Sequence, residues 1–223
     1  MRLSRAFAEP SSAKPVMLRW LAGQFARPSG LAGRFLIGPW LDRISRTMNA
    51  LVMVELDPKP GETVLEIGFG GGGLIQALLS RGVRSIGADV SQAMVRRAES
   101  RFGGRAAVVR ASVEALPFGD READKAASVN NIYFWPDPAA GMAELARVVR
   151  PGGLLAIAFE PPEELAKWPG HEYGFRLWSE AEVRSLMEAA GFERVRTVWG
   201  TGRKPDHFLC LTGVRGAAGR RDD

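Results

Sequence analysis

The chain has 223 residues, of which 46% are hydrophobic, and it carries a formal net charge of +5. This length predicts one sizeable core in a single α/β domain with appendages and argues against a second full domain. Cys210 is the only cysteine, and the two histidines, His171 and His207, lack the spacing of metal ligands. We therefore expect neither a disulfide framework nor a bound metal.

The positive charge is concentrated at the N-terminal end. Residues 1–50 hold eight Lys or Arg and two acidic residues, a net charge of +6, so the rest of the chain sums to −1. Such a segment can meet nucleic acid, an anionic membrane surface or an acidic substrate, or it can be an Arg-rich solvated face. The first residues lack an apolar signal region and the longest apolar run, 154–159, is too short to cross a bilayer. The sequence thus predicts a soluble, unexported, cytoplasmic protein.

Two helices are predicted before residue 58. Leu18, Leu21 and Phe25 recur at helical spacing within 16–27, and 40–56 has a second helical pattern. The stretch between them, RPSGLAGRFLIGP, has too many Gly and Pro residues for one continuous helix. We expect residues 1–58 to form a helical extension.

After Lys59 the pattern changes to short β-rich runs that alternate with helical segments. Strands are predicted at 62–67, 84–89, 106–110, 125–130, 153–160, 193–199 and 207–213, and helices at 72–81, 91–101, 138–149 and 180–190. Asp137-Pro138 and the Ser179/Glu182 capping box mark the starts of the last two helices. This order predicts a doubly wound, mostly parallel seven-stranded α/β sheet over 59–214, closed by an antiparallel C-terminal hairpin. Residues 215–223 are expected to be a disordered tail.

The most informative stretch is VLEIGFGGGG at 64–73. Gly68, Gly70 and Gly73 fit G-x-G-x-x-G after a strand, and Asp89 follows at the end of the next strand, as in dinucleotide-binding enzymes. Glu66 argues against that reading, because a carboxylate two residues before the loop opposes a pyrophosphate. A ligand with a cationic amino or sulfonium group would instead be attracted.

With these residues the sequence resembles the class I S-adenosylmethionine-dependent methyltransferases. The resemblance spans roughly residues 45–213 and continues, in order, through IGADVS, SVEALPF, RVVRPGGLLAI and EAAGF. The stretches RPSGLAGRF and NNIYFWPDP are similar to a subgroup that acts on small molecules. The resemblance implies a Rossmann-like fold and S-adenosylmethionine as cofactor.

The resemblance also implies roles for individual residues. Glu66 and the loop glycines would shape the site for the methionine end, Asp89 would hold the ribose, and Ser112 and Val113 would meet the adenine, although many relatives have an aspartate in place of Ser112. The carbonyl of Asn130 would lie near the amino group of the cofactor. The full cofactor-binding set implied is Glu66, Gly68, Phe69, Gly70, Gly72, Asp89, Val90, Ser112, Val113 and Asn130.

The acceptor would bind beyond the carboxyl ends of the strands. We expect its pocket to include Tyr133, Phe134, Trp135 and Glu160, although Phe134 and Trp135 could equally pack beneath the next helix. Because a sulfonium donor is already activated, a general base is optional. His171 and Tyr133 are the candidate bases.

The sequence as a whole predicts methyl transfer to an O, N or C atom of a small molecule, by a monomer or a homodimer. The N-terminal helices would fold over the cofactor as a lid or lie on a membrane surface. We expect no nucleic-acid partner, since no N-P-P-Y-type loop follows the fourth strand and no RNA-binding module is recognisable. The alternatives are a nucleic-acid methyltransferase, a nicotinamide oxidoreductase and a non-catalytic cofactor-binding protein.

Overall fold

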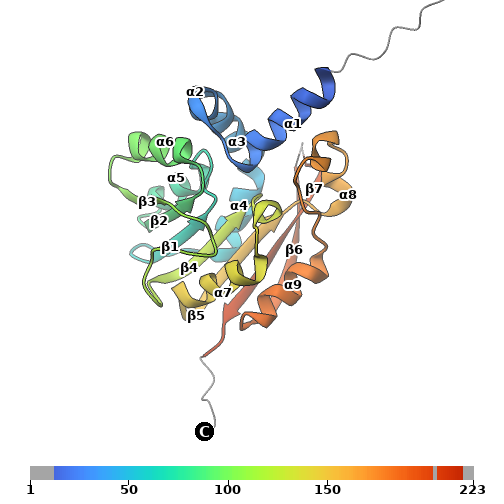
Figure 1. The fold of residues 1–223 in the computed structure, drawn as a ribbon. Coiled ribbons are helices and arrows are strands. Elements are labelled where there is room, and N and C mark those ends of the chain that lie inside the picture. Colours follow the sequence, from blue (N-terminus) through green and yellow to red (C-terminus); the bar gives the residue numbers. More distant parts are fainter. Residues whose placement is uncertain (1–12, 203–204, 218–223) are drawn as a thin grey trace, which may run out of the picture.

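A seven-stranded sheet forms the centre of the molecule (Figure 1). The computed structural model describes residues 13–202 and 205–217. The strand order is β3-β2-β1-β4-β5-β7-β6, with β1 to β5 parallel and β7 antiparallel to both of its neighbours. The strands are β1 (Thr63–Ile67), β2 (Arg84–Asp89), β3 (Ala106–Arg110), β4 (Ala123–Val129), β5 (Val149–Phe159), β6 (Phe192–Thr201) and β7 (His207–Arg215). The predicted doubly wound, mostly parallel sheet with an antiparallel C-terminal hairpin is confirmed.

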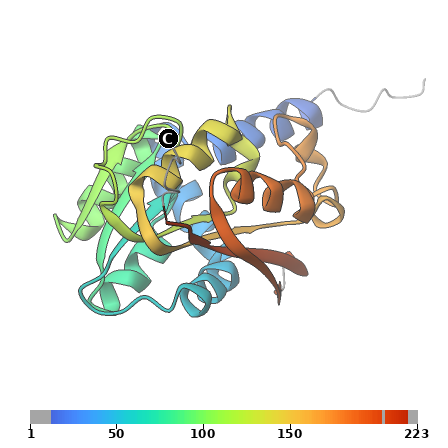
Figure 2. The same ribbon diagram turned by 90° about the horizontal axis from the view of Figure 1, so that it is seen from below.

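Helices cover both faces of this sheet (Figure 2). They are α4 (Arg46–Leu56), α5 (Gly73–Ser80), α6 (Gln92–Phe102), α7 (Pro138–Val148) and α9 (Glu180–Ala189), with shorter helical turns η2 (Ile132–Phe134), α8 (Pro162–Leu165) and η3 (Pro169–Glu172). Val64 packs in a buried cluster with α4 and α5, whereas its neighbour Leu65 packs in another with α7 and α9. Alternate residues of β1 therefore point to opposite layers, which explains why its whole sequence is apolar apart from Thr63 and Glu66.

The helix starts agree with the capping signals in the sequence. The Asp137 carboxylate accepts a hydrogen bond from the Ala140 N–H at 3.0 Å, and both halves of the Ser179/Glu182 capping box are formed. The C-terminal strand β7 reaches Arg215, and residues 218–223 of the predicted tail lie outside the described residues. Within the described part of the chain, no helix is long and apolar enough to span a membrane.

The N-terminal segment differs from the sequence prediction. Helix α1 (Ala13–Ala26) ends before a break at residues 27–29, as expected, but the rest of the Gly- and Pro-containing stretch is helical. It runs through α2 (Gly30–Ala32), a π-helical turn η1 (Gly33–Ile37) and α3 (Gly38–Ile44). A wider π turn accommodates the missing N–H of Pro39 at the start of α3, so the proline does not end the helix. The helix predicted over 40–56 is instead interrupted at Ser45.

Candidate active site

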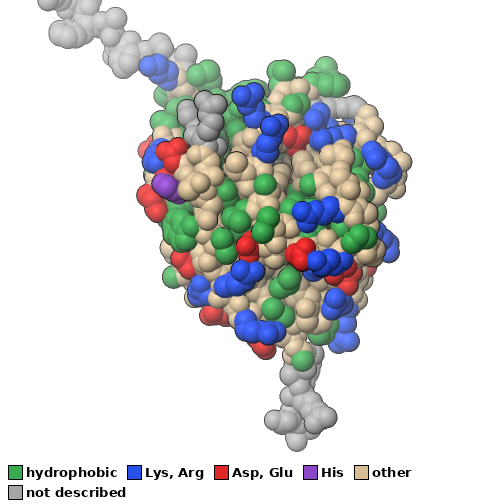
Figure 3. Space-filling model, turned by 180° about the vertical axis from the view of Figure 1, so that it is seen from behind, with side chains coloured by type: hydrophobic (Ala, Val, Ile, Leu, Met, Phe, Trp, Pro, Cys, Tyr) green, Lys and Arg blue, Asp and Glu red, His purple; other side chains and the backbone are tan. Residues whose placement is uncertain are grey.

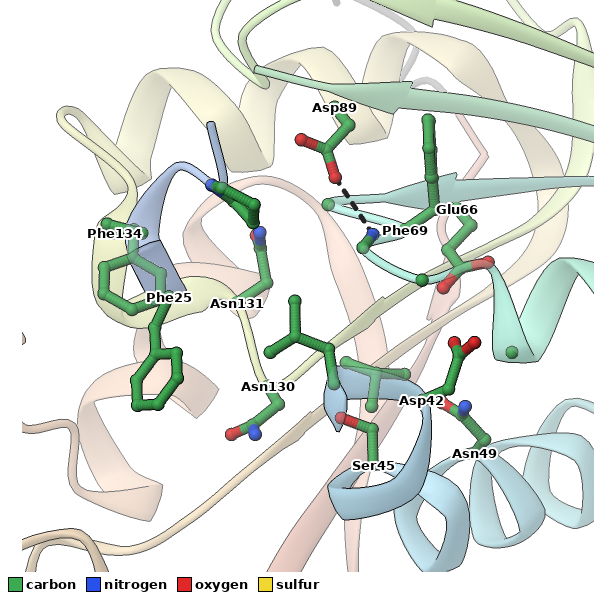
Figure 4. Close-up of a pocket in the computed structure, with 18 of the residues that line it drawn as sticks. Phe25, Asp42, Ser45, Asn49, Glu66, Phe69, Asp89, Asn130, Asn131 and Phe134 are labelled. Atoms are coloured by element: carbon green, nitrogen blue, oxygen red, sulfur yellow. Dashed lines mark hydrogen bonds between the residues drawn. The ribbon is translucent and has the colours of Figure 1, made fainter. Parts of the chain in front are cut away.

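Two adjoining cavities lie at the carboxyl ends of β1, β2 and β4, where open α/β sheets bind ligands. They hold about 600 Å³ and 750 Å³ of empty space, part of it open to solvent, and they share the walls made by Ala26, Gly68, Asp89, Val90, Asn131 and Phe134. Figure 4 shows the first cavity, with side chains from the glycine loop, from β4 and from the N-terminal helices around it. An elongated ligand can therefore contact residues of both cavities at once.

The glycine loop after β1 gives this site its close backbone surface. Gly68, Gly70 and Gly72 have φ angles of 64°, 49° and 86°, a region that favours glycine, and of the three Gly72 faces Phe102 and lines neither cavity. A Cβ atom on Gly68 would lie 1.8 Å from Nδ2 of Asn131. The loop therefore needs glycine at Gly68 for space as well as for backbone conformation.

Asp89 ends β2 and lies on the wall of both cavities. Its Oδ2 accepts a hydrogen bond from the Gly70 N–H at 2.9 Å, and its Oδ1 accepts one from the Ser91 N–H at 2.8 Å. The side chain is almost fully buried, and this burial raises its pKa to about 6. Two N–H donors fix the carboxylate and leave further lone pairs for a ligand.

Glu66 lies inside the first cavity and is 3% exposed. The Ile75 N–H donates a hydrogen bond to its carboxylate, but Oε2 has no partner among the described residues. Burial, reinforced by the carboxylates of Asp42 and Asp89, raises the pKa of Glu66 well above its usual value. A buried carboxylate with an unpartnered oxygen is expected to attract a cationic group.

The N-terminal helices form the opposite wall of the first cavity. Asp42 and Asn49 point toward the glycine loop in Figure 4, and Ser45 lines the same cavity. Asp42 is held by Arg101, whose Nη1 lies 3.0 Å from Oδ2 and donates a second hydrogen bond to the Gly71 carbonyl at 2.8 Å. At the N-cap of α6, the Ser91 hydroxyl donates a hydrogen bond to the carbonyl of Pro28, which lines the first cavity. Polar contacts thus join the N-terminal segment to Arg101, which also binds the glycine loop, and to Ser91 at the start of α6.

These wall residues were missed by sequence reasoning. Asp42, Ser45 and Asn49 are spaced by three and four residues, which would put them on one face of the helix predicted over 40–56. Polar side chains at that spacing were the available signal, but Arg43, Arg46 and Thr47 lie in the same stretch, so these three did not stand out.

The second cavity contains the residues expected to meet adenine. Ser112 and Val113 both line it, together with Val90 and Trp135. The Ser112 hydroxyl donates a hydrogen bond to the Glu114 carboxylate. Glu114, which was also missed from the sequence, therefore takes up the Ser112 hydroxyl hydrogen, so that Ser112 can only accept a hydrogen bond from a ligand.

Two asparagines follow β4. Asn130 lines the first cavity, with a φ of 54°, and its Oδ1 is buried without a partner among the described residues. Its side-chain amide hydrogen-bonds to the carboxylate of Glu160. Asn131 lies over Gly68, and its Oδ1 accepts a hydrogen bond from the indole N–H of Trp135. Glu160 thus orients the Asn130 amide, whose oxygen has no hydrogen-bond partner among the described residues.

The predicted acceptor residues divide into two groups. Phe134 lines both cavities, and Trp135 lines the second while also packing in the core. Tyr133 and Glu160 do not line either cavity among the described residues. The Tyr133 hydroxyl accepts a hydrogen bond from the Glu160 N–H, and burial together with Glu160 raises its pKa well above the usual value.

The other titratable candidates lie behind the cavity walls. Burial, with a smaller contribution from Glu164, raises the pKa of Glu160 to about 7. His171 lies in η3 and is not among the residues described as lining the cavities; its Nδ1 is 2.7 Å from the Trp168 carbonyl, to which it donates a hydrogen bond. No group of three or more His, Cys, Asp or Glu in the described ranges is arranged to hold a metal.

An aromatic cluster lies around Phe25 and Phe134, which line the first cavity. The ring of Phe25 stacks on Trp40 at 4.7 Å between centroids and lies 5.0 Å from Trp168. Phe175 contacts Phe134 at 4.5 Å and Trp168 at 5.3 Å. The cluster joins the N-terminal helices to the turn after β4 and to the segment before α9, so three distant parts of the chain meet here.

Comparisons with known proteins agree with this architecture. Residues 65–157 match the methyltransferase domain family. An uncharacterized methyltransferase of Bacillus subtilis, YdaC, is 32% identical over 176 residues, which cover 78% of this chain and 94% of YdaC. A demethylmenaquinone methyltransferase of Corynebacterium kroppenstedtii is 36% identical over 103 residues, 46% of this chain and 44% of that protein. The structure of an S-adenosylmethionine-dependent methyltransferase from Aquifex aeolicus superposes with a TM-score of 0.67 at 25% identity, covering 79% of this chain and 96% of the other.

Proposed function

The chain belongs to the class I S-adenosylmethionine-dependent methyltransferases, and we propose that it transfers a methyl group from S-adenosylmethionine to an O, N or C atom of a small-molecule acceptor. The observation that carries the proposal is the buried, unpartnered carboxylate oxygen of Glu66 beside the glycine loop. S-adenosylmethionine supplies a methyl group already activated on a sulfonium.

The charge of the first cavity supports a cationic ligand end. Glu66, Asp42 and Asp89 line it, and no Lys or Arg is among the described lining residues. Burial and the two acidic neighbours disfavour the ionised form of Glu66, and an ammonium group beside it would stabilise that form. A pyrophosphate would meet three carboxylates, so a nicotinamide oxidoreductase fits the cavity poorly.

The second cavity supports a nucleoside end. The lone pairs of Asp89 not used by Gly70 and Ser91 can accept hydrogen bonds from two ribose hydroxyls. Val90 and Val113 provide apolar surface for a base. Asp89 lies on the boundary of the two cavities, as a residue holding the middle of the cofactor should.

The acceptor side supports positioning and exclusion of water. Phe25, Phe134 and Val129 give this part of the first cavity apolar walls. Asn130 adds one hydrogen-bond acceptor, because its amide group is turned by Glu160 so that Oδ1 is unused. An O–H or N–H group of the acceptor donated to Oδ1 would orient the nucleophile, and alignment of this kind contributes much of the acceleration in methyl transfer.

The same walls favour a small acceptor over a nucleic acid. The walls around Phe25 and Phe134 are aromatic, and no Lys or Arg that could hold a phosphate backbone is among the described residues lining the first cavity. A nucleic-acid methyltransferase would instead retain RNA in a salt-sensitive manner.

The proposal is tested first by binding. We expect S-adenosylmethionine, but not a nicotinamide dinucleotide, to raise the thermal unfolding temperature. Asp89→Ala should weaken cofactor binding in calorimetry by at least about 100-fold, since two hydrogen bonds to a charged group are lost. Asp120→Ala, at a mostly exposed site away from both cavities, is the control. Unchanged affinity of the Asp89 variant would remove the ribose assignment.

Catalysis is tested separately. The protein is incubated with S-adenosylmethionine and a panel of phenols, amines and carbon acids, and S-adenosylhomocysteine is measured together with the mass gain of the acceptor. Turnover with one chemical class identifies the class of the acceptor. Tight cofactor binding without turnover on any class would favour the non-catalytic alternative.

A further inference from the structure

The N-terminal helices carry most of the exposed apolar side chains of the molecule. Of the ten large hydrophobic residues exposed in the described chain, seven lie between residues 16 and 40, and only three lie elsewhere. We name these seven the N-terminal apolar face: Val16, Met17, Trp20, Leu31, Phe35, Leu36 and Trp40. A concentration of this kind marks an interaction surface, whereas single exposed apolar residues do not.

The face is distinct from the side on which these helices pack. Val16, Met17 and Trp20 are spaced by three and four residues and so share one side of α1, and Leu36 and Trp40 are similarly related. On the inner side, Ala22 and Ile37 are buried. Folding has therefore already used one side of the segment, and the outer side remains apolar.

The segment that bears this face is strongly positive. Residues 13–50 contain six Lys or Arg and one acidic residue, Asp42, which is paired with Arg101. Lys14, Arg19 and Arg43 are exposed. Figure 3 shows hydrophobic and Lys or Arg side chains next to one another along the upper edge of the molecule. Apolar residues that include tryptophan, mixed with basic residues on short helices, are typical of segments that lie in the interface of an anionic membrane.

We propose that the N-terminal apolar face docks on an anionic membrane surface and that the methyl acceptor is a bilayer-resident amphiphile. The second part rests on the proposed function. It is supported by the place of Trp40, which belongs to the apolar face and stacks on Phe25, a residue of the first cavity. The docking face and the acceptor side of the cavity are thus one aromatic ring apart.

The test is flotation of the full chain, without cofactor, with vesicles of phosphatidylcholine alone or with about 30% phosphatidylglycerol. We expect flotation with the anionic vesicles at about 50 mM salt and much less at about 500 mM. Trp20→Ser combined with Leu31→Ser should reduce binding about tenfold or more, because both side chains are at least half exposed and apolar. Lys14→Glu combined with Arg19→Glu should do the same through charge.

Trp199→Ser is the matched control, since Trp199 is an exposed tryptophan on the edge strand β6, outside the apolar face. Absence of flotation at low salt would overturn the proposal, as would apolar variants that bind like the unmodified chain. A concentration-dependent dimer in sedimentation that the Trp20/Leu31 variant abolishes would assign the face to a second copy instead. Since no cofactor is present, failure here leaves the methyltransferase assignment untouched, and failure of cofactor binding leaves docking untouched.

Discussion

The substitution Glu66→Gln separates the cost of a buried charge from its use in binding. Glutamine has the same shape, so its Oε1 can keep the hydrogen bond from the Ile75 N–H. The substitution removes the negative charge that lies beside Asp42 and Asp89. We therefore expect the variant without cofactor to be more stable than the unmodified protein, and to bind S-adenosylmethionine more weakly.

The sign of the pH dependence follows from the raised pKa. Because the folded protein holds the Glu66 proton more tightly than the unfolded chain, its stability falls as pH rises from about the ordinary value of 4.5 toward the raised pKa. The stability difference between variant and unmodified protein should thus be small near pH 4.5 and grow toward pH 8. A buried unsatisfied group costs about 1–3 kcal/mol, and each kcal/mol shifts the unfolding temperature of a chain this long by about 2–4 °C.

The expected loss in the free energy of cofactor binding is similar in size to the gain in stability. A hydrogen bond to a charged group contributes about 1.5–3 kcal/mol, which corresponds to a loss of affinity of about 10- to 100-fold. Thermal unfolding at several pH values and calorimetry with S-adenosylmethionine measure the two effects. Glu163→Gln, the same change at an exposed position of α8, is the control. A variant that is less stable at pH 8, or that binds the cofactor with unchanged affinity, would refute the reasoning.

Two further substitutions test other parts of the site. Gly68→Ala should lower the free energy of unfolding by about 1–3 kcal/mol and abolish cofactor binding, because the residue has a positive φ and the new Cβ would collide with Asn131. Gly61→Ala, also at a positive φ but with nothing within 4 Å, isolates the backbone effect in denaturant unfolding; equal losses in the two variants would contradict the collision. With an identified acceptor, kcat should rise with pH through about 7 as Glu160 ionises and holds the Asn130 amide, and Glu160→Gln should remove this rise without changing cofactor affinity. Persistence of the pH-dependent rise in that variant would assign it to another group.

The sequence predicted the parts of the site that depend on local patterns. The strand ends, the glycine loop and Asp89 follow from residues close in sequence, and the structure places them together at the carboxyl ends of β1 and β2. Asp42 could not be placed in this way. Its position against Gly71 depends on how the N-terminal helices pack on a loop about thirty residues later, which no periodicity encodes.

For the residues expected to bind the acceptor, the sequence predicted the position in the chain but not the contacts of the side chains. Tyr133 and Glu160 are at the expected strand ends, yet their mutual hydrogen bond directs the tyrosine hydroxyl into the protein. Sequence placement identifies which residues reach the rim of a sheet, but side-chain partners determine which of them face the ligand. Asn130 was predicted to act through its backbone carbonyl. In the structure it lines the first cavity, and its side-chain Oδ1 has no hydrogen-bond partner among the described residues.

The charges of the N-terminal helices connect cofactor binding with the outer surface. Asp42 adds to the negative charge around Glu66, and Arg101 offsets that charge while it also binds the Gly71 carbonyl. This arrangement keeps the helices on the glycine loop without a ligand, whereas an ammonium group beside Glu66 would relieve the repulsion that remains. Cofactor binding should therefore tighten the attachment of the segment that bears Trp40 and the apolar face. A surface held in place by the cofactor is suited to meet the acceptor only when a methyl donor is present.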